Sequence, residues 1–199
     1  SVIVKADASN FEKAWPVRIE TLVQWLGTNM TQNVETFENA RLADQTEMGA
    51  VTLKVADLDN MIKYYTQALP LEVIAQQEGS AIIGRNNRPL VILEHAPALK
   101  HWSRRDAGLF HTAILFETET ALAAAVYSIA QYAPNTFTGS SDHLVSKAFY
   151  FNDPEGNGIE LYWDRDRSEW SWVHGEVEMD TLFLDPNQYL RDYLTEDAV

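Results

Sequence analysis

The sequence predicts an α+β protein in which two βαβββ units form a curled mixed sheet around a trough. Three observations predict this class. Short segments alternate between apolar and polar residues, as half-buried strands do. A stretch of helical periodicity follows the first such segment in each half of the central region. The order of these elements then repeats after about sixty residues, which indicates an internal duplication.

The first predicted unit covers residues 47–95. Residues 50–55 alternate and predict its first strand. Asp57 then precedes apolar residues at helical spacing, which predicts a helix with a side-chain cap. Three further strands, separated by turn-rich sequence, are predicted at residues 72–76, 80–84 and 90–94.

The second predicted unit covers residues 109–164 and has the same order. A strand is predicted at residues 111–116, and a helix follows Thr118 and ends before Pro134. Aligning the two units on their first strands and on their closing strands predicts that Val91 is the counterpart of Glu160. The remaining strands of this unit are predicted at residues 135–138, 147–152 and 158–163.

Two flanking segments complete the chain. Residues 1–46 are predicted to be a helical extension, because apolar residues recur at helical spacing between Pro16 and Leu26. This helix could pack on its own domain or serve as a dimerisation arm. Residues 165–199 form a tail rich in acidic and aromatic residues. The tail could be a solvated wrap around the domain, or a lid or inter-subunit strap.

Composition narrows the classes of function. The chain of 199 residues has 15 Lys and Arg against 29 Asp and Glu, a net charge of −14, which disfavours binding to nucleic acid. It has no cysteine, so any metal must be held by His, Asp or Glu. No apolar run approaches membrane-spanning length, and no signal pattern opens the chain. We therefore expect a cytoplasmic protein with no membrane partner.

Two residues of the second unit suggest a metal site on spacing alone. His111 opens the first strand of that unit, and Glu160 lies on its last strand. An imidazole and a carboxylate brought together from separate strands are common ligands of divalent metals. The alternative is that His111 is an ordinary hydrogen-bonded or surface histidine.

Two longer strings carry a family resemblance. MGAVTLKVADLDNMIKYYTQALPLEV resembles the opening of a vicinal oxygen chelate module, and GSSDHLVSKAFYFNDPEGNGIELYWDRDRSEW resembles its close. The chain is most similar to the glyoxalase, bleomycin-resistance and extradiol-dioxygenase branch, in particular to catechol 2,3-dioxygenase-like proteins, over residues 42–190. The resemblance implies paired βαβββ units and a divalent metal, with Fe²⁺ or Mn²⁺ favoured and Zn²⁺ or Ni²⁺ as alternatives.

The resemblance also implies roles for four residues. His111 and Glu160 match metal ligands of the family. His143 resembles a histidine that dioxygenases place near the bound substrate, and Tyr150 lies near a tyrosine that contacts substrate. The chain departs from the family at Ala50, where dioxygenases usually have a third ligand, a histidine. That departure leaves open whether a metal is bound.

A substitute ligand can be sought by strand parity. His95 shares a face with Val91 in the predicted strand and could reach the trough from its rim. Lys54 is also predicted to point inward, where it could neutralise Glu160 or bind an anionic substrate, or could lie along the wall with its ammonium group in water.

Three functions remain open at this point. The first is a metal-dependent enzyme acting on a small substrate with vicinal oxygens, with catechol-like ring cleavage favoured. The second is a metal-free protein that binds or sequesters a small molecule, as bleomycin-resistance proteins do. The third is a subunit that associates with copies of itself, and a homodimer is expected because paired sheets leave edge strands.

Overall fold

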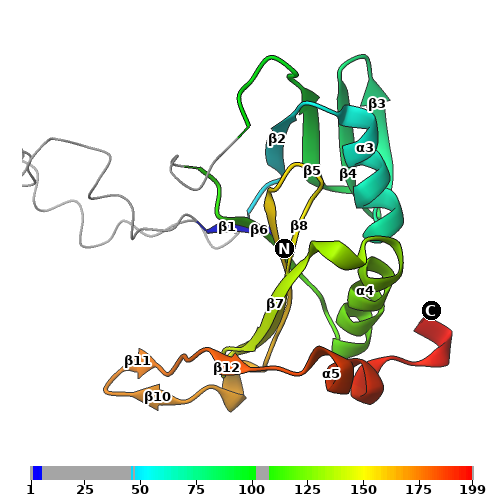
Figure 1. Ribbon diagram of the computed structural model, residues 1–199. Coiled ribbons are helices and arrows are strands. Elements are labelled where there is room, and N and C mark those ends of the chain that lie inside the picture. The colour runs from blue at the N-terminus through cyan, green and yellow to red at the C-terminus, as the bar shows by residue number, and fades with distance from the viewer. Residues whose placement is uncertain (1, 6–45, 47, 102–107, 199) are drawn as a thin grey trace, which may run out of the picture. The chain divides into compact units, whose positions relative to one another are not determined.

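The computed structural model describes the backbone of residues 2–5, 46, 48–101 and 108–198. The helix predicted between Pro16 and Leu26 lies outside the described residues. The described elements belong to one compact unit (Figure 1). No helix within these described ranges is long and apolar enough to span a membrane.

The first βαβββ unit is a four-stranded sheet and has the predicted order of elements. Its strands run in the spatial order β2-β5-β4-β3, with β2 parallel to β5 and the other pairs antiparallel. Asp57 caps the helix by accepting a hydrogen bond from the backbone N–H of Asn60 at 3.1 Å. The elements are β2 (Val51–Val55), α3 (Leu58–Lys63) with a π-helical turn (Tyr64–Ala68), β3 (Glu72–Gln77), β4 (Ser80–Arg85) and β5 (Arg88–His95).

The second unit repeats this topology within a six-stranded sheet. The order β6-β9-β8-β7 matches β2-β5-β4-β3, again with the first and last strands of the unit parallel. Thr118 caps the helix through the backbone N–H of Ala121. The elements are β6 (His111–Leu115), α4 (Glu119–Tyr132), a 3₁₀ turn (Pro134–Thr136), β7 (Phe137–Asp142), β8 (Ser146–Asn152) and β9 (Gly158–Asp164). The predicted duplication and fold class are confirmed.

Two strands from outside the units extend the second sheet at its edges. β1 (Val2–Lys5) pairs antiparallel with β6, and β12 (Leu182–Phe183) pairs antiparallel with β7. Neither strand was predicted from the sequence. Both are short, so neither carries enough alternation to be distinguished from a loop.

The register corrects one prediction. Thr52 pairs with Ile92 in the first unit, whereas Ala113 pairs with Glu160 in the second. Because Ala50 corresponds to His111, the counterpart of Glu160 is Ile92, and the predicted Val91 is wrong by one residue. A shift of one residue moves a side chain to the other face of a sheet.

The two faces of the sheets differ in what covers them. Helices α3 and α4 lie on one side, where the main core includes the fully buried Tyr65, Phe149 and Leu161 (Figure 1). The opposite face of the second sheet has a smaller apolar cluster. Its members come from β6, β8 and β9, and they are Ala113, Leu115, Ala148, Tyr150 and Tyr162. This second face is the one that faces the predicted trough.

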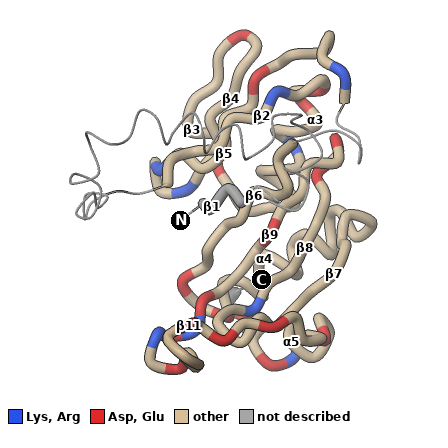
Figure 2. The backbone as a smooth tube through the Cα atoms, turned by 90° about the vertical axis from the view of Figure 1, so that its left-hand side faces the viewer, with Lys and Arg blue, Asp and Glu red and all other residues tan. Residues whose placement is uncertain are grey.

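The tail follows the second unit. It contains 3₁₀ turns (Arg167–Glu169 and Glu196–Ala198), the strands β10 (Trp172–Val173) and β11 (Glu176–Val177), β12, and α5 (Pro186–Tyr193). Acidic residues are frequent along the backbone around β11 and α5 (Figure 2). Helix α5 packs against α4 and buries Tyr189. The ammonium group of Lys147 in β8 donates hydrogen bonds to Glu119 in α4 at 2.5 Å and to the Tyr193 hydroxyl in α5 at 3.1 Å. The tail therefore has its own packed elements.

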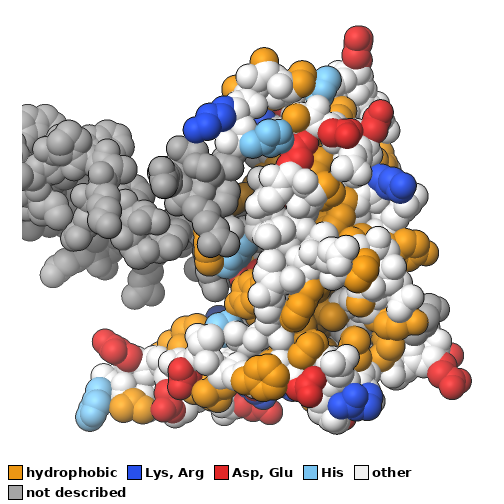
Figure 3. Space-filling view, viewed as in Figure 1, with side chains coloured by type: hydrophobic (Ala, Val, Ile, Leu, Met, Phe, Trp, Pro, Cys, Tyr) orange, Lys and Arg blue, Asp and Glu red, His pale blue; other side chains and the backbone are white. Residues whose placement is uncertain are grey.

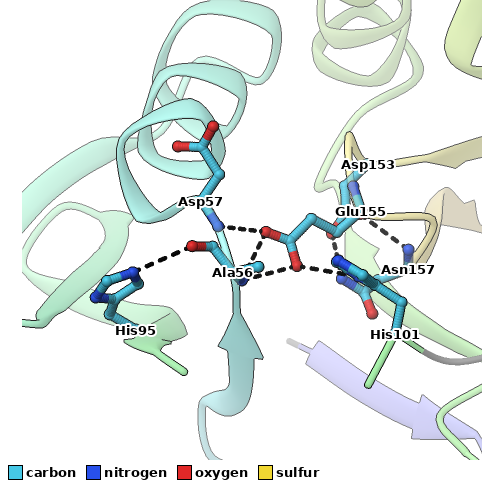
Figure 4. Close-up of polar contacts among 7 residues, drawn as sticks. All are labelled: Ala56, Asp57, His95, His101, Asp153, Glu155 and Asn157. Atoms are coloured by element: carbon cyan, nitrogen blue, oxygen red, sulfur yellow. Dashed lines mark hydrogen bonds and ion pairs between the residues drawn. The ribbon is translucent and has the colours of Figure 1, made fainter. Parts of the chain in front are cut away.

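The turn between β8 and β9 joins the two units. The Glu155 carboxylate accepts hydrogen bonds from the backbone N–H groups of Ala56 at 2.8 Å and Asp57 at 2.7 Å (Figure 4). His101 lies 3.7 Å from the same carboxylate. The buried Asp153 carboxylate accepts a hydrogen bond from the Tyr65 hydroxyl at 3.3 Å. The two acidic residues of this turn thus bind atoms of the first unit.

Candidate functional site

The four predicted site residues lie in one connected group on the second sheet. Neighbouring strands supply His111 (β6), Glu160 (β9) and Tyr150 (β8), and His143 follows the end of β7. Tyr150 is directly opposite Glu160 in the antiparallel register, so both side chains point to the same face. Strand period and register alone therefore bring these groups together.

His111 and Glu160 form the buried centre of the group. Nε2 of His111 is 2.7 Å from Oε2 of Glu160, and the two side chains are only 8% and 4% exposed. Despite this short distance, Nε2 makes no hydrogen bond of ordinary geometry with any residue that the structure describes. The imidazole nitrogen and the carboxylate oxygen thus converge side by side, as two ligands of one cation do.

Tyr150 and His143 extend the group toward solvent. The Tyr150 hydroxyl donates to Oε1 of Glu160 at 2.9 Å and lies 2.8 Å from Nε2 of His143. Burial and the nearby Glu160 charge raise the pKa of Tyr150 well above its ordinary value, so its hydroxyl keeps its proton at neutral pH. Nδ1 of His143 lies 2.9 Å from the backbone carbonyl oxygen of Asp180 in the tail.

A glycine at the start of β9, directly after the β8–β9 turn, lies against His111. A Cβ added at Gly158 would lie 2.3 Å from the Phe110 carbonyl oxygen and 3.1 Å from the His111 Cβ. Only glycine therefore allows β9 to approach the start of β6 so closely. The turn itself is fixed by Asp153, whose Oδ1 accepts the backbone N–H groups of Glu155 and Asn157, both at 2.9 Å.

A cleft and one further polar group, the Tyr162 hydroxyl, lie near His111 and Glu160. A cleft of about 210 Å³ is lined by His111, Tyr150, Phe110 and Phe151, among others. The Tyr162 hydroxyl is buried on the trough face and has no hydrogen-bond partner among the residues that the structure describes. Tyr162 was not predicted from the sequence, although it is two residues beyond Glu160 and strand alternation places it on the same face.

The first unit contributes no ligand at the equivalent positions. Ala50 replaces the expected histidine, and Ile92 is the register counterpart of Glu160. Lys54 is exposed and pairs with Glu94 across the strands. His95 shares the helix-side face with Val91, and its Nε2 lies 3.1 Å from the Ala56 carbonyl oxygen, so the structure does not place it with His111 (Figure 4).

The side chains at the site therefore supply two of the ligands that a metal ion would need. His111 and Glu160 provide a nitrogen and an oxygen that converge, and Nε2 is not engaged by another described residue. No cluster of three His, Asp or Glu side chains suited to a metal occurs in the described part of the chain. Two protein ligands leave several coordination positions for water or for a chelating substrate.

Comparison with known proteins defines the class. Residues 47–161 match the Glyoxalase/Bleomycin resistance protein/Dioxygenase superfamily. This match covers more than half of the chain, and the chain therefore belongs to that superfamily.

The chain is also similar to one curated protein and to solved structures of the same description. Over 129 residues the chain is 33% identical to the catechol-2,3-dioxygenase of Bacillus subtilis, an alignment that covers 64% of this chain and 45% of that protein. The chain thus spans about half the length of this curated relative. A glyoxylase/bleomycin resistance protein/dioxygenase domain from Frankia has the same fold, with a TM-score of 0.51, 19% identity, and coverage of 61% and 94% of the two chains. A protein of the same description from Alicyclobacillus acidocaldarius has a TM-score of 0.49, 13% identity, and coverage of 64% and 98%.

Proposed function

We propose that this protein is a metal-dependent enzyme that acts on a small substrate with two adjacent oxygen atoms, and that the favoured reaction is cleavage of a catechol-like ring. The observation that carries the proposal is the buried convergence of His111 and Glu160, with Tyr150 and His143 hydrogen-bonded next to them. The 33% identity to a catechol-2,3-dioxygenase supports the choice of reaction.

His111 and Glu160 would hold a divalent ion, with Fe²⁺ or Mn²⁺ favoured and Zn²⁺ or Ni²⁺ as alternatives. A bound ion supplies Lewis-acid stabilisation of negative charge on the adjacent substrate oxygens. The Glu160 carboxylate stays in position because Tyr150 donates to its other oxygen. Substrate oxygens would fill positions that a third protein ligand would otherwise take.

His143 and Tyr150 would handle the protons. A catechol must lose protons when its oxygens become ligands, and a histidine next to the substrate is suited to accept one. Nε2 of His143 and the Tyr150 hydroxyl are within hydrogen-bond distance, so a proton taken from substrate has a defined place to go. The cleft next to His111 and Tyr150 is also lined by Phe110, whose exposed ring suits an aromatic substrate.

A second candidate function is a metal-free protein that binds a small organic molecule. The observation that favours it is the donor set, because only His111 and Glu160 converge and the first unit offers Ala50 and Ile92. In that case the cleft lined by His111 and Tyr150 would hold the ligand.

The test compares catechol turnover with binding. Full-length protein is loaded with Fe²⁺ under anaerobic conditions, and oxygen uptake is followed after catechol is added. Ring cleavage by a dioxygenase consumes one O₂ for each catechol and puts both oxygen atoms into the product. The proposal predicts matched consumption in the parent and none in a His111→Ala, Glu160→Ala double variant.

A matched control is Glu94→Ala, which removes an exposed carboxylate from the other sheet and should leave turnover unchanged. Absence of turnover with Fe²⁺ and Mn²⁺, combined with a thermal shift on adding catechol to metal-free protein, would favour the binding function instead.

A further inference from the structure

One segment of the tail lies against the candidate acid–base residue. We call residues 180–184 the clasp. Its Leu182 and Phe183 pair with Asp142 and Ser141 of β7, next to His143 in sequence. The Ser140 hydroxyl donates to the Leu184 carbonyl oxygen at 2.8 Å, which fixes the far end of the clasp. At its near end the Asp180 carbonyl oxygen lies 2.9 Å from Nδ1 of His143.

We propose that the clasp positions His143 and selects its tautomer, so that the proton it exchanges is the one on Nε2, facing Tyr150. This inference rests on the proposed acid–base role of His143. A carbonyl oxygen can only accept a hydrogen bond, so Nδ1 must carry a hydrogen to bind Asp180. The remaining nitrogen, Nε2, is then the atom that gains and loses a proton.

Counting hydrogens on the next pair of contacts supports this assignment. The Tyr150 hydroxyl has one hydrogen and two neighbours, Nε2 of His143 at 2.8 Å and Oε1 of Glu160 at 2.9 Å. When Tyr150 donates to the Glu160 carboxylate, Nε2 can bond to the hydroxyl oxygen only as a donor. When Nε2 has no hydrogen, it instead accepts the Tyr150 hydrogen, and in both cases the Asp180 carbonyl oxygen accepts the hydrogen on Nδ1. The clasp thus accommodates both the neutral and the charged imidazole without breaking the Nδ1 bond.

A hydrogen bond also fixes the orientation of the Asp180–Thr181 peptide group, whose carbonyl oxygen contacts His143. The Asp180 side chain accepts a hydrogen bond from the backbone N–H of Thr181 at 2.7 Å. The clasp is nevertheless lightly attached, because β12 has only two residues and Phe183 is 86% exposed. Apolar and acidic side chains lie together along the lower edge of the molecule, where Figure 1 places β10, β11 and β12 (Figure 3). Few contacts need to be broken to release the clasp.

The turn that carries His143 also has hydrogen bonds that do not involve the clasp. The Asp142 carboxylate accepts a hydrogen bond from the backbone N–H of Leu144 at 2.9 Å. It also forms an ion pair with Arg165 at 2.5 Å. The backbone N–H of His143 donates to the Ser146 carbonyl at 2.8 Å. Releasing the clasp should therefore free the imidazole ring while its backbone stays in place, and this difference makes the proposal testable.

The experiment reads the ring nitrogens directly by ¹⁵N NMR of full-length protein treated with chelator, so it needs neither metal nor turnover. We expect the neutral form of His143 in the parent to carry its hydrogen on Nδ1. Leu182→Pro should break the β12 pairing and shift the ratio of Nε2–H to Nδ1–H by about fivefold to tenfold, as the loss of one hydrogen bond implies.

Val173→Pro is the matched control, because it places proline in the neighbouring hairpin and leaves residues 180–184 unchanged; the parent tautomer should persist. An Nε2–H tautomer in the parent would overturn the proposal even if Leu182→Pro failed to fold. So would an unchanged tautomer in Leu182→Pro when amide spectra show that β12 is released. If these spectra agree with the proposal but catechol is not consumed, the proposed function fails while the positioning role stands.

Discussion

At the scale of single residues, the hydroxyl of Tyr150 is the link between the buried carboxylate and the half-buried imidazole. It contacts both Glu160 and His143, and burial keeps it protonated. We expect Tyr150→Phe to lower kcat for catechol cleavage by about 10-fold to 100-fold, as loss of a supporting hydrogen bond at a metal ligand does. Stability should change little, because the ring remains. Steady-state kinetics and thermal unfolding measure the two effects, and unchanged kcat would remove Tyr150 from the mechanism.

A second residue-scale prediction concerns pH. Burial raises the pKa of Asp153 above its ordinary value of 3.8. The folded state therefore binds the Asp153 carboxyl proton more tightly than the unfolded state does. The stabilisation that this proton provides is complete when the pH is below the ordinary pKa, and it is lost as the pH rises through the raised pKa. The free energy of unfolding of the parent minus that of Asp153→Asn should therefore fall as pH rises from the ordinary value of 3.8 through the raised pKa.

Urea unfolding at several pH values measures this difference. Tyr65→Phe is the control, because it removes one hydrogen bond to Asp153 but keeps the titrating carboxyl group. A difference between parent and Asp153→Asn that rises with pH would contradict the assignment.

At the scale of elements, the approach of β9 to β6 depends on Gly158. An added methyl group would meet the Phe110 carbonyl oxygen at 2.3 Å, and backbone atoms cannot move aside cheaply. We expect Gly158→Ala to destabilise the protein by about 1 to 3 kcal/mol and to displace His111. Gly49→Ala is the matched control, since nothing lies within 4 Å of its added Cβ. Equal unfolding free energies for the two variants would contradict this account.

The elements show what the sequence could and could not predict. Alternation and helical period predicted the strands and helices of both units, because one face of each is buried. The predicted register of β5 was wrong by one residue, because an irregularity in its pairing with β4 leaves Leu90 as an extra residue between Pro89 and Val91, and a comparison of strand sequences ignores this. Helix α5 was missed, although Asp185 followed by Pro186 is a typical helix start.

The sequence predicted which side chains of the candidate site converge, but not the contacts that they make with backbone atoms. Strand period was enough to predict that His111 and Glu160 converge, and their role as metal ligands stays a prediction. The contact of Asp180 with His143 involves a backbone carbonyl, and the contact of Glu155 with Ala56 involves a backbone N–H. Backbone atoms are the same in every residue, so no sequence pattern could indicate either contact.

At the scale of the whole molecule, Glu155 connects the two units. Its carboxylate accepts the backbone N–H groups of Ala56 and Asp57 beside the start of α3. We expect Glu155→Ala to lower the free energy of unfolding by about 1 to 3 kcal/mol, because partly buried donors lose their acceptor. Denaturant unfolding measures the loss. Glu178→Ala, which removes an exposed carboxylate in the tail, should have little effect, and equal losses would contradict a specific role for Glu155.

The molecule belongs to a superfamily whose name joins glyoxalases, bleomycin-resistance proteins and dioxygenases, and it spans about half of the curated catechol-2,3-dioxygenase that it resembles. Its second unit has the converging histidine and glutamate, whereas the first has Ala50 and Ile92. The two halves thus differ at the positions that are proposed to hold the metal. The predicted homodimer and the cytoplasmic location stay predictions.

The most direct test of this account is the metal content of untagged protein prepared anaerobically, measured by elemental mass spectrometry beside the His111→Ala, Glu160→Ala double variant. The account predicts close to one equivalent of Fe, Mn, Zn or Ni in the parent, absent from the variant. Equal metal content in the two proteins, or none in the parent after incubation with each ion, would contradict a metal site at His111 and Glu160.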